Sequence, residues 1–282
     1  MRVHYLNCGT DCPFGGATFD GFSKGPTARI VCAAQLIETN DGLVLVDTGY
    51  GTQDVEQPNR LPAFFRASLN IQLRREETAL HQIRALGFAP RDVRHILLTH
   101  LDFDHAGGIE DFPEARVHVT AIEKDLAERH RRGFINSRRY QPVQFDDVRD
   151  WRTYGPGGDD WFGFEAVRGL EGLPPEILMV PLPGHTLGHA GVAIDTGAGW
   201  ILNAGDAYFF RGEMDVHRPH CTPGLAGYQR LMEMDHHARM TNQHRLRELK
   251  RRHGAEITVF CSHDAKELEA MQAGSRAEAA AA

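Results

Sequence analysis

The sequence has no long apolar run. No stretch approaches the ~20 apolar residues that a membrane-spanning helix needs. The first residues, MRVHYLNCGTDCPFGG, also lack the extended apolar segment of a secretory signal. We therefore expect neither a secretory signal nor a membrane partner.

Cysteine and excess positive charge are also scarce. Five cysteines, an odd number, in 282 residues fit a reducing compartment better than a disulfide framework. We therefore predict a cytoplasmic protein in which Cys8 and Cys12 are free thiols. Lys and Arg total 31 against 38 Asp and Glu, so the formal net charge is −7. A net acidic chain argues against binding to nucleic acid through its phosphates, and we expect no such partner.

Neither an internal repeat nor a linker rich in Pro, Gly and Ser divides the chain. Short β-rich runs recur between helical patterns, and an Asn-Asp-Gly turn at 40–42 joins two of these runs as in a β-hairpin. The pattern predicts one α/β domain over residues 1–270, with insertions near 52–74, 133–160 and 210–252. The last segment, 271–282, is expected to be a disordered tail.

Histidine, in contrast, is abundant, with 16 residues. Four possible metal ligands, His100, Asp102, Asp104 and His105, fall within six residues directly after a hydrophobic strand predicted at 95–98. Because a strand end holds the backbone rigid, side chains in the following loop can turn inward together. Imidazole and carboxylate groups suit Zn²⁺, Fe or Mn²⁺. The alternative is a polar surface loop that happens to contain two histidines.

Three further predicted strands end in a residue of the same kind. These residues are His185 in a Pro-Gly turn after strand 177–180, Asp206 after strand 200–203, and His263 after strand 256–260. Four strand ends that each deliver His or Asp are difficult to obtain by accident, and this repetition favours a metal centre over a polar surface loop.

The order and rough spacing of these motifs resemble those of the metallo-β-lactamase-fold hydrolases. The resemblance extends from Leu-Val-Leu-Val-Asp-Thr-Gly at 43–49 to Cys-Ser-His-Asp at 261–264, which is nearly the whole chain. It implies an α/β fold of the αββα type, in which two mixed β-sheets face each other between flanking helices. The metal centre would lie at one edge of the two sheets.

The resemblance also implies a set of ligands for two divalent metal ions, zinc in the first place, with iron or manganese as alternatives. The first ion would be held by His100, Asp102 and His185, the second by Asp104, His105 and His263, and Asp206 would bridge the two. Asp47 matches a family position that supports the ligands from behind.

Asp102 departs from the common family pattern, which has histidine at this position. A carboxylate makes the first site more anionic and favours oxygen-loving metals somewhat more. The di-iron oxidoreductase branch of the superfamily uses Glu here, but Asp is one methylene shorter. Three outcomes stay open: a binuclear site with Asp102 as a ligand, a weak first site, or one metal ion at the second site.

Two residues are candidates for a catalytic role. Asp104 would act as a proton shuttle. Tyr208 lies two residues after the bridging aspartate, whereas N-acyl homoserine lactonases of this fold have a catalytic tyrosine three residues after it. Its phenol could donate to the substrate carbonyl or to a developing oxyanion. The alternative is an aromatic side chain packed in the core.

Other conspicuous residues favour structural interpretations. His189 follows His185 by four residues and is interpreted as a hydrogen-bonded structural histidine, because the metal site already has its ligands. A basic cluster is interpreted as a solvated face, with the rim of an anionic-substrate site as the alternative. Its members are Arg129, Arg131, Arg132, Arg138 and Arg139.

The resemblance thus predicts a metal-dependent hydrolase of a carbonyl ester, most simply a lactone or small ester. A metal-bound hydroxide would attack the carbonyl carbon, because a bound metal lowers the pKa of water to about 7. The expected partner is a small-molecule substrate, and the lactonase-like branch suggests a homodimer. Alternatives are thioester or phosphodiester hydrolysis by the same fold, or a metal-binding protein without turnover if Asp102 disables the first site.

Overall fold

The computed structural model describes residues 1–129, 133–155 and 157–281. Its strands are β1 (Arg2–Asp11), β2 (Ile30–Thr39), β3 (Gly42–Val46), β4 (Val93–Leu97), β5 (Arg116–Thr120), β6 (Trp151–Tyr154), β7 (Asp159–Trp161), β8 (Phe164–Gly169), β9 (Ile177–Pro181), β10 (Ala190–Asp195), β11 (Trp200–Asn203) and β12 (Ile257–Phe260). Its α-helices are α1 (Ala17–Asp20), α2 (Thr52–Glu56), α3 (Ala63–Ser68), α4 (Ala79–Ala85), α5 (Phe103–Ala106), α6 (Ala121–Arg129), α7 (Asn136–Arg139), α8 (Pro223–Met232), α9 (His236–His253) and α10 (Ala265–Ala281). Short 3-10 helices span Pro58–Arg60, Arg75–Glu77, Pro90–Asp92, Ile109–Asp111, Pro142–Gln144 and Arg211–Met214.

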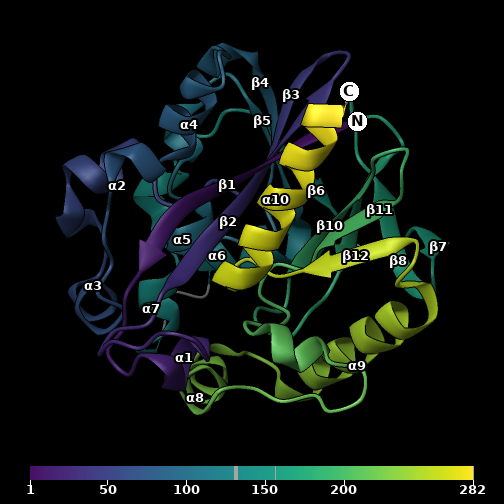
Figure 1. Ribbon diagram of the computed structural model, residues 1–282. Coiled ribbons are helices and arrows are strands. Elements are labelled where there is room, and N and C mark those ends of the chain that lie inside the picture. Colours follow the sequence, from purple (N-terminus) through teal and green to yellow (C-terminus); the bar gives the residue numbers. More distant parts are fainter. Residues whose placement is uncertain (130–132, 156, 282) are drawn as a thin grey trace.

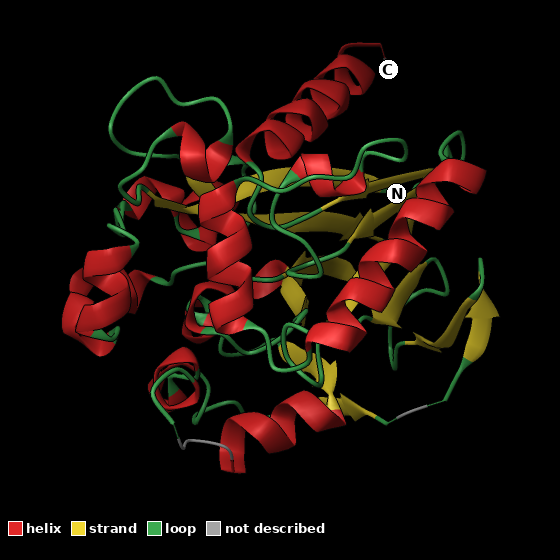
Figure 2. Cartoon of the chain, turned by 90° about the horizontal axis from the view of Figure 1, so that it is seen from below, coloured by secondary structure: helices red, strands yellow, loops and turns green. Residues whose placement is uncertain are grey.

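The strands form two mixed sheets of six strands each (Figure 1). The first has the order β1-β2-β3-β4-β5-β6, with antiparallel pairs up to β3 and parallel pairs from β3 to β6. The second has the order β12-β11-β10-β9-β8-β7 and is antiparallel except for the β11–β12 pair. Figure 2 shows the strands of both sheets in the interior of the molecule, with helices around them.

Alternating side chains on the first sheet separate two apolar cores. On β3, Leu45 belongs to the core that the first sheet forms with α4 and α6, whereas Val44 and Val46 belong to another core. That second core also contains Ile177 and Val192 of the other sheet, so it lies between the sheets. Because successive side chains of a strand point to opposite faces, one apolar strand serves both layers. A third core joins the second sheet to α9. The predicted αββα sandwich is therefore confirmed.

The chain end differs from the prediction. We expected a disordered tail over 271–282, but α10 runs from Ala265 to Ala281. Gln272 donates a hydrogen bond to the carbonyl of Tyr5, and Ser275 donates one to that of Val3. These contacts with β1 explain why the segment continues as a helix, because they hold it against the first sheet. Figure 1 shows α10 crossing β1 and β2.

The segments predicted as insertions contain short elements of their own. The first carries α2 and α3, the second carries α7 and β6, and the third carries α8 and most of α9. The division into one domain over 1–270 stays a prediction. Among the described residues, no helix is both long enough and apolar enough to cross a membrane.

Candidate metal centre

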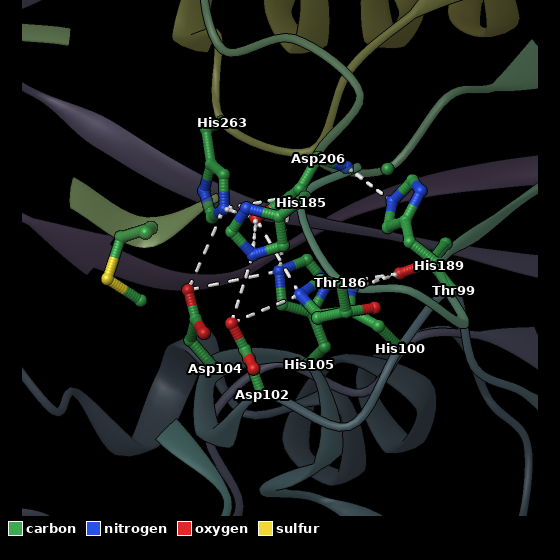
Figure 3. Close-up of polar contacts among 12 residues, drawn as sticks. Thr99, His100, Asp102, Asp104, His105, His185, Thr186, His189, Asp206 and His263 are labelled. Atoms are coloured by element: carbon green, nitrogen blue, oxygen red, sulfur yellow. Dashed lines mark hydrogen bonds and ion pairs between the residues drawn. The ribbon is translucent and has the colours of Figure 1, made fainter. Parts of the chain in front are cut away.

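The seven predicted ligands come together at one edge of the sandwich, as Figure 3 shows. Each follows a strand: β4 precedes the segment from His100 to His105, and β9, β11 and β12 precede His185, Asp206 and His263. Six of the seven are buried, and Asp104 is half-buried. Parallel and antiparallel strands that end at the same edge thus place ligands from four parts of the sequence side by side.

Two glycines make the turns that deliver the ligands of the second sheet. Gly184, with φ of 146°, precedes His185, and a Cβ there would lie 2.5 Å from the backbone of Arg239. Gly205, with φ of 54°, precedes Asp206, and a Cβ there would lie 2.5 Å from Nε2 of His189. Both positions favour glycine because other residues rarely adopt these angles and a side chain would not fit.

The first group of donors contains His100, Asp102, His185 and Asp206. Oδ2 of Asp102 lies 3.4 Å from Nε2 of His100 and 3.0 Å from Nε2 of His185. Oδ2 of Asp206 lies 3.7 and 3.4 Å from the same two nitrogens. A tetrahedral ion with bonds of about 2.0–2.1 Å has neighbouring ligand atoms about 3.3–3.4 Å apart. The spacing of these four side chains therefore fits a divalent ion.

The second group contains Asp104, His105, His263 and again Asp206. Oδ1 of Asp206 lies 3.4 Å from Nε2 of His105 and 3.1 Å from Nε2 of His263. Oδ2 of Asp104 lies 3.9 and 3.7 Å from these nitrogens. Oδ2 of Asp206 also lies 3.2 Å from Nε2 of His263, so the carboxylate of Asp206 contacts both groups, as a bridging carboxylate would.

Partners behind the imidazoles determine which nitrogen faces the centre. Nδ1 of His263 donates to the carbonyl of Val31 at 2.8 Å, and Nδ1 of His105 lies 3.0 Å from Oδ2 of Asp47. With the proton on Nδ1, the lone pair of a neutral imidazole is on Nε2, which is the nitrogen a metal needs. Asp47 therefore lies behind the predicted ligands, the position that the family resemblance implied for it.

Several donor atoms of the centre are buried without a protein partner. Nε2 of His100, Nε2 of His105 and Oδ1 of Asp206 have no hydrogen-bond partner in the described part of the chain. A buried polar atom without a partner costs free energy, so such atoms need an explanation. Three of them pointing into one centre fit a group that accepts lone pairs, such as a divalent ion.

The charges of the centre favour a cation in the same place. Burial disfavours the charged form of His105, but the carboxylates of Asp206 and Asp104 outweigh burial and hold the pKa of this imidazole well above its usual range. Burial also opposes ionisation of Asp206, yet the neighbouring imidazoles, His263 first, hold the pKa of its carboxyl well below its usual range. The carboxylates therefore create a potential that stabilises positive charge between them.

His189 has the structural role that the sequence suggested. Its Nδ1 donates to the carbonyl of Leu182 at 2.9 Å, and its Nε2 accepts a hydrogen bond from the backbone N–H of Asp206 at 2.9 Å. Both ring nitrogens are therefore occupied, so this histidine positions the Asp206 turn and has no free lone pair for a metal.

Arg139 corrects the interpretation of the basic cluster. Its side chain is fully buried at the centre, whereas Arg129 is exposed and Arg138 is half-buried, and Arg131 and Arg132 lie outside the described residues. Nε and Nη2 of Arg139 donate to Oδ1 and Oδ2 of Asp102, both at 2.6 Å. Burial opposes ionisation of Asp102, but this guanidinium holds the pKa of the carboxyl well below its usual range. Arg139 thus leaves the predicted solvated face because it neutralises a buried carboxylate.

Tyr208 does not lie where the catalytic assignment requires it. The side chain is buried in the core beneath α9, and its hydroxyl donates to the carboxylate of Glu267 at 3.0 Å. The chain turns at Gly205, and the residue that faces the metal centre is Phe209, whose ring centroid is 4.7 Å from that of His263. Tyr208 therefore has the core-packing role that the sequence left as the alternative.

A pocket opens onto the ligands. Its metal-side wall contains Asp102, Asp104, His185, Asp206 and His263. The remaining wall is largely apolar and consists of Pro13, Phe19, Ile30, Leu69, Phe209, Leu225 and Met232, with Asp11 and Tyr228 as polar members. Pro13 and Phe19 come from the segment that follows β1, and Leu69 directly follows α3.

Sequence reasoning missed the two polar members of the wall. Burial raises the pKa of Asp11, at the end of β1, to about 8, and the Tyr50 hydroxyl lies 3.1 Å from its carboxylate. Burial, followed by the charges of Asp104 and Asp11, raises the pKa of Tyr228 well above its usual range, so its phenol keeps its proton. No local motif marks either residue, because the fold alone brings them to the centre.

Comparison with known proteins agrees with this geometry. The family model of the metallo-beta-lactamase superfamily matches residues 29–263. A probable metallo-hydrolase of Mycobacterium tuberculosis is 41% identical over 264 residues, which cover 94% of this chain and 80% of that protein. An N-acyl homoserine lactonase of Bacillus thuringiensis is 24% identical over 220 residues, which cover 77% of this chain and 80% of the relative.

Solved structures share the fold at lower identity. An N-acyl homoserine lactone hydrolase with N-hexanoyl-L-homoserine bound at its catalytic metal centre superposes with a TM-score of 0.70 at 19% identity, covering 95% of each chain. A probable metal-dependent hydrolase from Staphylococcus aureus superposes with a TM-score of 0.65 at 17% identity, covering 93% of this chain and 88% of that one. From its fold and its relatives, the chain belongs to the metallo-beta-lactamase superfamily and is a metallo-hydrolase.

Proposed function

We propose that this metallo-hydrolase cleaves a lactone or small ester with an apolar substituent, and that it uses two divalent ions, zinc in the first place. One observation carries the proposal: two adjoining groups of His and Asp donors, with nitrogen–oxygen distances of 3.0 to 3.9 Å, open onto a largely apolar pocket. A site of this kind can hold an uncharged ester with its carbonyl at the ions and its substituent against the apolar wall.

In the proposed centre, each ion has four protein donors. The first is held by His100, Asp102, His185 and Asp206, and the second by Asp104, His105, His263 and Asp206. When bound, such ions supply an activated water and polarise the ester carbonyl. The chain contributes the fixed orientation of the imidazoles, through Asp47 and the carbonyl of Val31, and the exclusion of bulk water by the pocket wall.

The charge of the pocket favours an uncharged ester over a phosphodiester. Among the described residues that line it, none is lysine or arginine, whereas Asp11, Asp102, Asp104 and Asp206 are acidic. A phosphodiester carries a negative charge that would meet these carboxylates, and a glutathione-type thioester would bring carboxylates with no cationic side chain of the wall to pair with. Phosphodiesters and glutathione-type thioesters therefore fit the charge of the pocket less well than a neutral ester does.

Two side chains are proposed to act on the substrate. Asp104 is half-buried and faces the pocket, so its carboxylate can take the proton of the attacking water and pass it to the leaving alkoxide. Tyr228 replaces Tyr208 as the proposed phenol donor, because it lines the pocket and keeps its proton. Its hydroxyl would donate to the carbonyl oxygen as negative charge develops there.

Two further proposals concern the cellular location and the oligomeric state of the protein. All five cysteines are free, which supports a reducing, cytoplasmic location. The exposed rings of Phe14, Phe64 and Phe134 support a homodimer, because exposed apolar side chains favour association.

A substrate panel tests the proposed function. Protein that contains zinc is assayed against acyl lactones, short-chain esters, thioesters and phosphodiesters, beside a chelator-treated sample and the same sample after zinc is restored. We expect hydrolysis of a lactone or ester that chelation removes and zinc restores. Hydrolysis only of thioesters or phosphodiesters would reject the proposed substrate class. Bound metal without turnover on any class would favour the metal-binding protein.

The two tyrosines provide a matched pair of variants. Tyr228→Phe is expected to lower kcat by about a hundredfold with little change in KM, because a hydrogen bond to an oxyanion is strongest in the transition state. Tyr208→Phe should leave kcat unchanged and reduce the free energy of unfolding by about 1 kcal/mol, because only its bond to Glu267 is lost. Steady-state kinetics and chemical denaturation measure both effects. A larger loss of kcat in Tyr208→Phe than in Tyr228→Phe would reverse the assignment.

A further inference from the structure

Arg139 contacts two of the proposed ligands of the first ion. It lies at the end of α7, and its guanidinium donates to both oxygens of Asp102, to Nε2 of His185 at 2.8 Å and to the carbonyl of Met232 at 2.9 Å. The side chain is fully buried, and Asp102 and His185 are nearly so. A cationic side chain is thus built into the first group of donors, and the proposed function assigns it no role.

The contact with His185 excludes a metal bond at the same nitrogen. Arginine is always a donor and has no acceptor, so Nε2 of His185 must be the acceptor of the hydrogen bond from Nη2. A neutral imidazole has one lone pair, and this pair cannot be shared between a hydrogen bond and a metal ion. Either Arg139 or a divalent ion can therefore occupy this lone pair.

Charge acts in the same direction. A guanidinium in proteins does not lose its proton, so a divalent ion bound by His185 and Asp102 would lie next to a fixed positive charge in a buried, low-dielectric site. Arg139 also uses both oxygens of Asp102 and weakens the pull of that carboxylate on an ion. The second group of donors has no comparable contact: among the described residues, the side-chain partners of Asp104 and His105 are histidines, carboxylates and the Thr99 hydroxyl, and none is lysine or arginine.

We propose that Arg139 is a resident cation that competes with the first metal ion for His185 and Asp102, so that the two metal sites differ in affinity. The second site fills first and tightly. The first site fills only when Nη2 of Arg139 leaves His185. This inference rests on the proposed metal centre. Of the outcomes that the sequence left open for Asp102, it selects a weak first site, because the carboxylate of Asp102 is already paired with Arg139.

A metal titration tests the inference without any measurement of activity. Metal-free protein is titrated with Zn²⁺ against a chromophoric chelator, and bound zinc is counted by elemental analysis after gel filtration. For the wild type we expect one tight ion per chain and a second ion bound at least about a hundredfold more weakly, as a neighbouring unit charge would cause. Arg139→Met should strengthen the weak site by a similar factor and give two tight ions.

Arg138→Met is the matched control, because Arg138 is the half-buried neighbour of Arg139 in α7 and its guanidinium lies 4.2 Å from the ring centroid of Phe134. It should titrate as the wild type does. Arg139→Met leaves Asp102 buried without its partner, so a second variant, Asp102→His combined with Arg139→Met, removes both charges. This double variant should also bind two tight ions.

The outcomes separate the two proposals. Two equally tight ions in the wild type, or a first site that neither variant strengthens, would overturn the competition while the proposed metal centre stands. A loss of stability in Arg139→Met with unchanged zinc affinities in the double variant would reduce Arg139 to a link between α7 and α8. Absence of zinc from the wild type and from the double variant would overturn both proposals.

Discussion

Replacing His105 or His263 with alanine is expected to abolish hydrolysis and to remove the ion of the second group of donors. Each imidazole supplies one of the four proposed ligands of this ion. Its Nδ1 is held from behind, in His105 by Asp47 and in His263 by the carbonyl of Val31, so that its Nε2 faces the centre. We expect kcat/KM to fall at least a thousandfold, which is about 4 kcal/mol of transition-state stabilisation. Bound zinc should fall by about one ion per chain.

His237→Ala is the control for these variants, because this histidine lies exposed on α9 and the change is chemically the same. It should keep full activity and full metal content. Elemental analysis measures the metal content of all three variants, and steady-state kinetics measures their activity. Wild-type activity with unchanged zinc in either His105→Ala or His263→Ala would contradict the assignment of the second site.

Replacing Asp206 with alanine is expected to leave at most one ion per chain and to cost a similar factor in kcat/KM. Among the described residues, Asp206 is the one side chain that presents an oxygen to both groups of donors, and a shared carboxylate offsets the repulsion of two cations about 3.5–4 Å apart. The turn itself should survive, because the backbone N–H of Asp206 still donates to His189.

Asp206→Asn distinguishes charge from shape in the same position. Asparagine keeps one oxygen but loses the negative charge, so we expect it to hold fewer ions than the wild type and to lose most of the activity. Zinc counts by elemental analysis, with circular dichroism to verify the fold, measure the effect. Two tightly bound ions in Asp206→Ala would show that this carboxylate is not the bridge.

The positions of the proposed ligands could be predicted because each depends on local sequence. A short apolar run such as 95–98 predicts a buried strand, and a histidine or aspartate after it is placed by the strand end. The four strand ends then meet because the fold aligns them. This local logic extends to Asp47, which ends the Leu-Val-Leu-Val run of β3 and lies behind His105.

Arg139 could not be predicted in this way. Arg139 is 37 residues from Asp102, in a segment whose sequence has neither a helical nor a strand period. Its guanidinium reaches the centre only because the fold places α7 beside Asp102. Tyr208 failed for a related reason, since the direction of its ring depends on the turn at Gly205 rather than on its distance from Asp206.

The missed secondary structure has equally physical causes. The strands β6 and β7 are short and carry polar residues, so no apolar run in the sequence predicts them. Each lies at the outer edge of its sheet, where pairing with one neighbouring strand suffices. The tail was misjudged because its helix is stabilised by packing on β1, a contact between the two ends of the chain.

Metal analysis combined with an activity assay shows whether the edge of the sandwich is a metal centre for ester hydrolysis. Protein purified without added metal is analysed for zinc, iron and manganese per chain, and the same sample is assayed with an acyl lactone before and after chelation. We expect at least one divalent ion per chain and lactone hydrolysis that disappears with the ion and returns with it. A metal-free protein, or hydrolysis that chelation leaves unchanged, would contradict a metal-dependent ester hydrolase.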